Sequence, residues 1–402
     1  MISFPIKRLY VSELISQSVA IYPLYAIMFG ERSGLTLSQV GLILGLFSIT
    51  TIVAEVPTGA IADRFSRKWS LILSKLMLAA AMVVWLFWPG MTGYCIGIVL
   101  MGFEEALYSG AMQSYLYEQL ADRNKEFAHI NARLWAMMMA GWTVGAALAA
   151  LVGPNYRLLL ILSVISPLIG AAITASLPSD RLDIAARHAE TGGSLLANTK
   201  AAAHYIFSAR TVLYAVLSIV SLKLLVDVLI EYIPLYYKGS GVSTETIPLL
   251  FFVGNAITIG LFWFSRQLSA LVRRRELAIG TILVILLLIT SQLGMWASIL
   301  GMFWYVRVVR MLFVTQEGEI QHLLIDRHRA TVTSIYSMIT RLLMALSLVI
   351  IGRFAVGSKG VVGPILVFVP LVYLCYALLY RQNRNHVPRS GIEALPHVHP
   401  TA

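Results

Sequence analysis

The stretch GAIADRFSRK, residues 59–68, joins two apolar runs at 37–59 and 70–89. A helix needs roughly 20 apolar residues to cross a bilayer core of about 30 Å, and both runs reach that length. In the connecting stretch, Asp63 is followed by three basic residues, which favour water over lipid. The sequence therefore predicts a short charged loop between two membrane-spanning helices.

The same apolar pattern extends in both directions from this loop. Only 13% of the 402 residues are charged, whereas soluble domains average about 25%. This composition excludes a soluble enzyme and a disordered chain, and it predicts an all-α membrane protein. The two cysteines, Cys95 and Cys375, lie in apolar runs, so we expect neither a disulfide framework nor a cysteine metal site. The twelve predicted transmembrane helices cover about 10–29, 37–59, 70–89, 93–117, 128–152, 157–177, 210–236, 246–265, 276–294, 297–321, 330–355 and 361–380.

The basic residues predict the orientation of these helices. Cytoplasmic loops of membrane proteins carry an excess of Lys and Arg. With both termini in the cytoplasm, most of the 31 basic residues fall on the cytoplasmic side. The opposite side receives five, namely Arg32, Arg157, Lys238, Arg353 and Lys359. This asymmetry also accounts for the net charge of +11 without a nucleic-acid partner.

Two six-helix halves are indicated by a polar connection and by an internal repeat. A shift of 208 residues places Gly110 on Gly318, Gln113 on Gln321 and Arg133 on Arg341. Parallel repeats of this kind occur in secondary transporters. The predicted organisation is an N-terminal half at 1–178, a cytoplasmic linker at 179–209, a C-terminal half at 210–381 and a cytoplasmic tail at 382–402.

The loop at residues 59–68 closely resembles the Gly-x-x-x-Asp-Arg-x-Gly-Arg-Lys signature of the major facilitator superfamily, with Ser66 in place of a glycine. The resemblance implies that this loop stabilises one state of an alternating-access cycle. The segments 55–58 and 109–118 are similar to an efflux-type subgroup. Two signatures of drug–proton antiporters are absent, because residues 101–107 contain no arginine and Gly153-Pro154 lies at a helix end. The predicted cytoplasmic gate comprises Gly59, Asp63, Arg64, Arg67, Lys68, Glu55, Glu118, Arg133 and Arg341.

Ionisable residues inside the predicted spans are the candidates for function, since charges in a bilayer are costly. They concentrate in the predicted helices 10–29, 93–117, 210–236 and 297–321, which the family fold places around a central cavity. A fixed arginine suits a carboxylate or phosphate, and a carboxyl group shielded from water can carry a proton. The candidate substrate-binding residues are Arg307, Arg310, Trp304, Lys223, Asp227, Gln17 and Tyr108, and the candidate proton-coupling residues are Glu104, Glu105 and Glu231.

A structural role for the same charges stays open, because a pair such as Glu104 with Arg310 could hold the halves together. Arg133 and Arg341 could pair with Glu118, Glu317 or Glu319 near the inner gate. Lys75 is expected to extend toward the cytoplasm.

The predicted function is proton-coupled export of a small amphoteric or anionic solute by a monomer in a bacterial inner membrane. The alternatives are uptake of a small solute and a receptor or scaffold that does not transport. No His-Glu-x-x-His, Gly-x-Ser-x-Gly or Walker motif occurs, so we expect neither an enzyme nor an ATP-driven pump. We expect no cofactor and no metal. The expected partners are the solute, protons and the lipid bilayer.

Overall fold

The chain forms an all-α structure. A computed structural model describes residues 4–64, 66–120, 127–179, 195–263, 275–324, 326–357 and 359–386. Its helices are α1 (Phe4–Ser16), α2 (Tyr25–Ser33), α3 (Leu37–Arg64), α4 (Arg67–Phe87), α5 (Met91–Gln119), α6 (Phe127–Val152), α7 (Tyr156–Ala175), α9 (Leu195–Ser208), α10 (Arg210–Gly239), α11 (Ile247–Trp263), α13 (Glu276–Thr290), α14 (Met295–Leu323), α15 (Asp326–Phe354) and α16 (Val362–His386).

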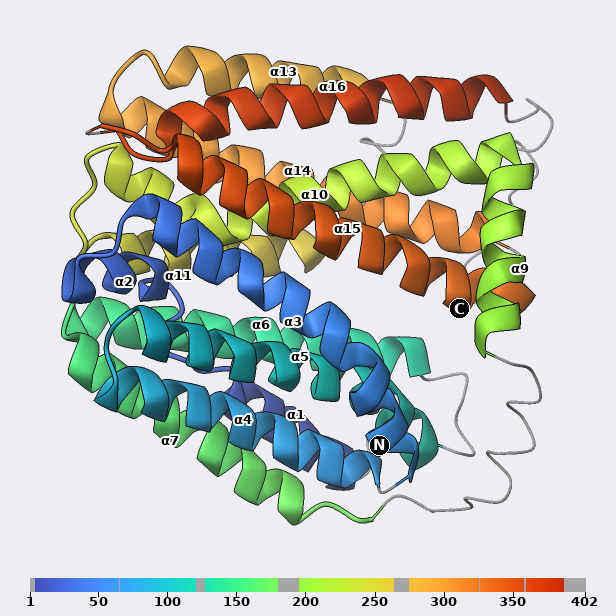
Figure 1. Cartoon of the computed structure of the whole chain (residues 1–402), viewed down its shortest axis with the longest axis horizontal. Helices are drawn as coiled ribbons and strands as arrows, with labels where there is room; N and C mark the ends of the chain where they lie inside the picture. The colour runs from blue at the N-terminus through green and yellow to red at the C-terminus, as the bar shows by residue number, and fades with distance from the viewer. Residues whose placement is uncertain are drawn as a thin grey trace.

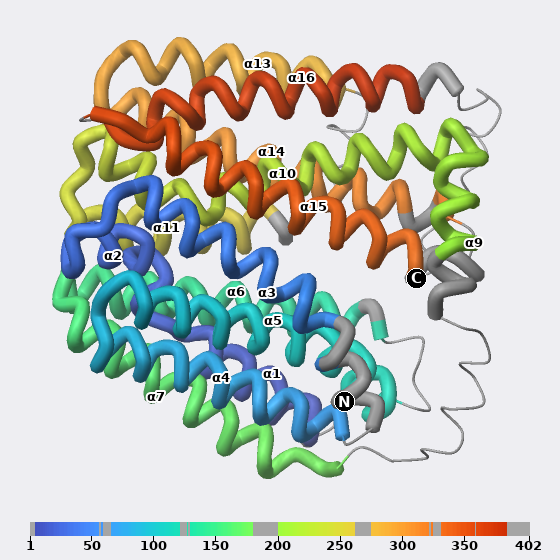
Figure 2. Tube along the Cα trace, viewed as in Figure 1, coloured from blue at the N-terminus to red at the C-terminus, as the bar shows by residue number. Residues whose placement is uncertain are grey.

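The helices form two bundles that lie side by side (Figure 1). Helices α1–α7 make one bundle, and α10–α16 make the other. Helix α1 begins and α16 ends at the same end of the molecule, which we call the terminal end (Figure 2). Helix α9 also lies there. It occupies part of the connection predicted as a cytoplasmic linker, while residues 180–194 lie outside the described residues.

Within the described residues, nine helices are long and apolar enough to cross a membrane. They correspond to nine of the twelve predicted spans. Helices α11 and α13 are apolar but shorter and coincide with two more. Helix α16 extends to His386, so it includes the start of the predicted tail.

The remaining span, predicted as a continuous helix over 10–29, is interrupted, and that prediction is wrong. Helix α1 ends at Ser16, and α2 begins only at Tyr25. Within the interruption the backbone N–H of Ile21 donates to the Ser163 hydroxyl at 3.0 Å, instead of to a carbonyl one turn earlier. Pro23 has no N–H to donate, which also disfavours a regular helix.

Glycines in α6 let that helix lie against the end of α1 and against the interruption that follows it. A Cβ on Gly141 would come within 2.5 Å of the Leu14 carbonyl oxygen, and one on Gly145 within 2.8 Å of the Val19 carbonyl oxygen. Only residues without side chains permit such close backbone contact. The irregular segment is therefore held inside its bundle by direct packing.

The two bundles meet closely at the end opposite the terminal end, which we call the closed end. A Cβ on Gly41 of α3 would lie 2.6 Å from the Leu348 carbonyl oxygen of α15. Within the second bundle, Tyr232 of α10 donates to that same carbonyl at 2.5 Å. Glu31 of α2 pairs with Lys238 and accepts a hydrogen bond from Thr244 at 2.9 Å, which adds polar contacts between the bundles.

Candidate functional site

A cavity of about 320 Å³ lies between the two bundles. This volume is near the lower end of the range for small-molecule sites. Both bundles contribute walls, and the interruption between α1 and α2 contributes as well. The charged residues that line it are Glu104, Glu105, Glu231, Arg307 and Arg310, and its aromatic residues are Tyr22, Tyr25, Phe47, Tyr108, Trp142, Tyr237 and Phe251.

The acidic wall of the cavity belongs to α5 of the first bundle. Glu104 and Glu105 are adjacent, so their side chains point about 100° apart around the helix. Glu105 forms an ion pair with Arg341 of α15 at 3.1 Å, which joins the two bundles. Glu104 is buried and forms no hydrogen bond or ion pair with any described residue. One carboxylate is thus engaged, whereas its neighbour lines the cavity without a polar partner.

The basic wall belongs to α14 of the second bundle, and its two arginines differ. The Arg307 guanidinium lies 4.4 Å from the centre of the Phe303 ring and donates to the Phe303 and Gly254 carbonyl oxygens at 3.5 and 3.4 Å. A Cβ on Gly254 would lie only 1.6 Å from Arg307 Nη2, so the glycine is required for this position.

Arg310 contacts the first bundle through an aromatic ring. Its guanidinium lies 6.0 Å from the centre of the Trp142 ring of α6. In the part of the chain that the structure describes, it forms no ion pair and no hydrogen bond. The cavity therefore contains one acid and one base, from opposite bundles, that lack polar partners.

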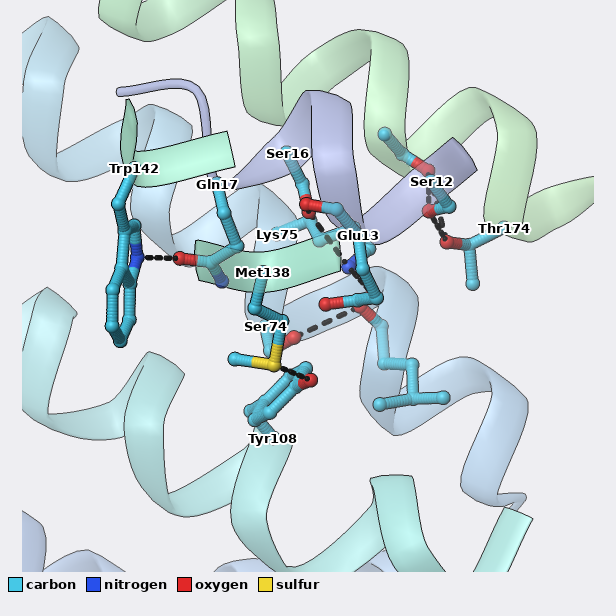
Figure 3. Close-up of polar contacts among 12 residues, drawn as sticks. Ser12, Glu13, Ser16, Gln17, Ser74, Lys75, Tyr108, Met138, Trp142 and Thr174 are labelled. Carbon is cyan, nitrogen blue, oxygen red and sulfur yellow. Dashed lines mark hydrogen bonds and ion pairs between the residues drawn. The ribbon is translucent and has the colours of Figure 1, made fainter. Parts of the chain in front are cut away.

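The interruption between α1 and α2 carries polar side chains into the cavity. Trp142 donates from its indole nitrogen to Gln17 at 2.9 Å, and Tyr108 donates to the Met138 sulfur at 3.1 Å (Figure 3). Tyr25 donates a hydrogen bond to Glu231 of α10 and so links the bundles. Gln17 and Glu231 are thereby oriented by aromatic neighbours.

Beside the cavity lies a buried ion pair that the sequence analysis did not anticipate. Lys75 of α4 was expected to extend toward the cytoplasm, but this prediction is wrong. Its ammonium group lies 2.6 Å from Glu13 of α1 and donates to Ser16 at 3.2 Å (Figure 3). Both side chains are at most 3% exposed. The signal available was the opposite charge of the two residues at similar depth, since a buried lysine needs a partner.

Three predicted substrate-binding residues do not line the cavity. Trp304 is 46% exposed, because it lies about 120° around α14 from Arg310. Lys223 and Asp227 pair with each other at 2.9 Å, one turn apart on α10 and beyond the cavity lining. Of the predicted residues, the cavity brings together Arg307, Arg310, Gln17, Tyr108, Glu104, Glu105 and Glu231.

The predicted gate residues at the terminal end make contacts inside the first bundle. Arg67 pairs with Glu118 of α5 at 2.5 Å, and Lys68 donates to the Leu177 carbonyl oxygen at 2.6 Å. The side chains of Gly59, Asp63 and Arg64 lie outside the described residues.

The ion pairs predicted for the gate residues Arg341 and Arg133 are wrong. Arg341 pairs with Glu105 instead of Glu118, Glu317 or Glu319. Arg133 is exposed and forms no ion pair within the described residues. Glu55 is half-buried in α3, and Glu317 accepts a hydrogen bond from Tyr336 at 3.1 Å.

Across the described ranges, no group of three or more His, Cys, Asp or Glu side chains could hold a metal ion. Two helical bundles around a charged, aromatic cavity are the architecture of a membrane transporter that binds a solute at its centre. Residues 10–347 match the sequence profile of the Major Facilitator Superfamily, and the chain belongs to that family. It is therefore an integral membrane protein and a secondary transporter that works by alternating access, not an enzyme.

Solved structures share this fold over nearly the whole chain. The nucleoside transporter NupG is 12% identical, with a TM-score of 0.74, and the match covers 94% of this chain and 99% of NupG. A bacterial homologue of the human lysosomal transporter Spinster is 14% identical, with a TM-score of 0.70 and coverage of 95% and 96%. A D-xylose-proton symporter is 12% identical, with a TM-score of 0.69 and coverage of 96% and 97%. No curated protein matches the chain in sequence.

Proposed function

We propose that this transporter exports a small anionic or amphoteric solute in exchange for protons. The observation that supports this best is the pair of cavity charges that form no hydrogen bond or ion pair with the described residues, Arg310 on α14 and Glu104 on α5. An arginine that is not already in an ion pair is suited to bind a carboxylate or phosphate of the solute. Ionisable residues without partners inside a membrane mark substrate or proton pathways.

In this proposal Glu104 is the principal proton carrier, and Glu105 and Glu231 assist it. Glu105 is held by Arg341 and Glu231 by Tyr25, so a change of protonation at either acid acts on a contact between the bundles. Such contacts must break and reform when the cavity changes the side that it faces. Proton binding is thereby linked to the movement of the two bundles.

The proposed location is a bacterial inner membrane, with both termini in the cytoplasm. The distribution of basic residues supports this orientation. The closed end then lies on the extracytoplasmic side, where Gly41 packs on α15 and Glu31 pairs with Lys238. The efflux-type resemblance of residues 55–58 and 109–118 supports export as the direction.

A comparison of metabolites inside and outside cells tests the proposal. A deletion strain is complemented with the wild type, with Glu104→Gln/Glu105→Gln, or with Glu245→Gln, an exposed acid outside the cavity. We expect one compound to accumulate inside the deletion strain and the double variant, and to leave cells that carry the wild type or the control. Depletion inside the deletion strain with persistence in the medium would instead mean uptake. No difference between the deletion strain and the wild type would contradict a transport function.

A further inference from the structure

The charged lining of the cavity can be divided by what each side chain already binds. Glu105 is paired with Arg341, Glu231 is bonded by Tyr25, and Arg307 rests on two carbonyl oxygens and a phenylalanine ring. Glu104 and Arg310 remain, and neither has a polar partner among the described residues. The cavity thus offers one negative and one positive position to a solute.

These two positions lie on opposite bundles and do not neutralise each other. Glu104 is on α5 and Arg310 is on α14, and the structure records no ion pair between them. A solute with a single charge would form an ion pair with one of them and leave the other without one inside the membrane. A charge without a partner in such a site is costly, so the cavity discriminates against singly charged solutes.

Aromatic side chains also line the cavity. Trp142 lies beside the Arg310 guanidinium, and Phe47, Phe251 and Tyr237 also line the cavity. Aromatic rings pack against one another in offset or edge-to-face arrangements and favour a planar apolar body over a polar one. The lining therefore suits a solute whose body is itself aromatic.

We propose that the solute is a zwitterion with an aromatic body, of the chemical class of the aromatic amino acids. Its ammonium group pairs with Glu104, and its carboxylate pairs with Arg310. The bound solute bridges the two bundles through the two charges that form no ion pair among the described residues. This inference rests on the proposed transport function and specifies the substrate class of the same cavity.

Three compounds with one body and different charges test the proposal. Tryptophan carries both charges, N-acetyltryptophan only the negative charge, and tryptophan amide only the positive charge. Their dissociation constants are measured by thermal unfolding of the purified protein in detergent and by displacement of labelled tryptophan. We expect tryptophan to bind at least tenfold more tightly than either derivative.

Two variants assign the ends of the solute to their partners. Glu104→Gln should remove the preference for tryptophan over N-acetyltryptophan, because the ammonium group no longer has an anion to pair with. Arg310→Gln should remove the preference for tryptophan over its amide, and Arg310→Lys should partly retain it. The exposed controls Glu245→Gln and Arg353→Gln should keep both preferences. Unfolding without ligand shows whether each variant is folded.

Equal binding of tryptophan and either derivative would overturn the inference, as would the absence of binding by all three. This failure is distinguishable from failure of the transport function. If the metabolite comparison identifies a transported compound that is not a zwitterion, the transport function stands and the zwitterion is excluded.

Discussion

Two sets of charged residues lie near each other in this membrane protein, and they differ in whether they form an ion pair. The side chains of Glu13 and Lys75 are buried, at most 3% exposed, and the Glu13 carboxylate lies 2.6 Å from the Lys75 ammonium group. The ammonium group also donates a hydrogen bond to the Ser16 hydroxyl. Glu104 and Arg310 line the central cavity without a partner of opposite charge in the described structure. The charges of the first set are paired with each other, whereas those of the second set are available to a solute or to protons.

Whether a charge is paired distinguishes structural charges from functional ones more clearly than its depth in the membrane does. Both sets are costly in lipid, and both are found in spans rich in apolar residues. A satisfied pair inside one bundle holds α1 against α4 and does not change when the bundles move. Unsatisfied charges on the two facing bundles are available to a solute and to protons. The predictions below test this contrast.

The largest effect is expected from breaking the buried pair. Glu13→Gln or Lys75→Met alone leaves one buried charge without its partner and should lower the free energy of unfolding by about 3–5 kcal/mol. The double variant removes both charges and should recover most of that loss. Unfolding of the purified protein in detergent measures both effects, and a double variant as unstable as the single ones would show that the pair is not the cause.

Arg310→Gln should leave the stability close to that of the wild type and should impair transport. The loss of a charge-assisted pair with the solute costs about 2–5 kcal/mol, so we expect transport to fall at least about 30-fold. Solute efflux from cells is the measurement, and Arg353→Gln is the exposed control. Unchanged efflux by a folded Arg310→Gln would remove Arg310 from the binding site.

Gly254→Ala tests whether the engaged arginine also matters. A Cβ at this position would lie 1.6 Å from Arg307 Nη2 and would force the guanidinium away from α11. We expect the KM for the solute to rise roughly tenfold, the equivalent of about 1.4 kcal/mol. Gly260→Ala on the same helix is the matched control, because a Cβ there meets no atom within 4 Å. An equal effect of both variants would point to α11 itself rather than to Arg307.

Tyr25→Phe should have the smallest effect. It removes one hydrogen bond between the bundles, to Glu231, worth about 1 kcal/mol. We expect the ratio of molecules that are shut at the closed end to molecules that are open there to fall about fivefold. Spin labels at positions 88 and 356, both exposed near the closed end, report the distance between the bundles. Tyr94→Phe removes a bond to Ser33 inside one bundle and should leave the distance distribution unchanged.

The sequence predicts most of the architecture, because membrane-spanning helices follow from apolar length alone. It fails at the first span, where residues 17–24 are as apolar as a helix but are held irregular by Ser163 and by the close packing of Gly141 and Gly145. Those contacts join segments more than 100 residues apart, and no local pattern contains them. Pro23 was the one local signal.

The cavity charges could likewise be predicted, since ionisable residues in four spans are rare and conspicuous. Their partners could not. The Lys75 side chain is long enough to reach either the cytoplasm or Glu13, and several acids lie within the sequence range expected for Arg341. The packing of the helices therefore determines which ion pairs form. Trp304 shares a helix with Arg310, but the helix turns it away from the cavity toward the outside.

The most direct test of the contrast uses two variants in one deletion strain, Arg310→Gln and Glu13→Gln/Lys75→Met, with equal amounts of folded protein in the membrane. The rate at which the accumulated compound leaves the cells is measured for each and compared with the wild type. We predict that the double variant, which lacks the buried pair, exports the compound, and that Arg310→Gln does not. Export by Arg310→Gln together with its loss in the double variant would contradict the account.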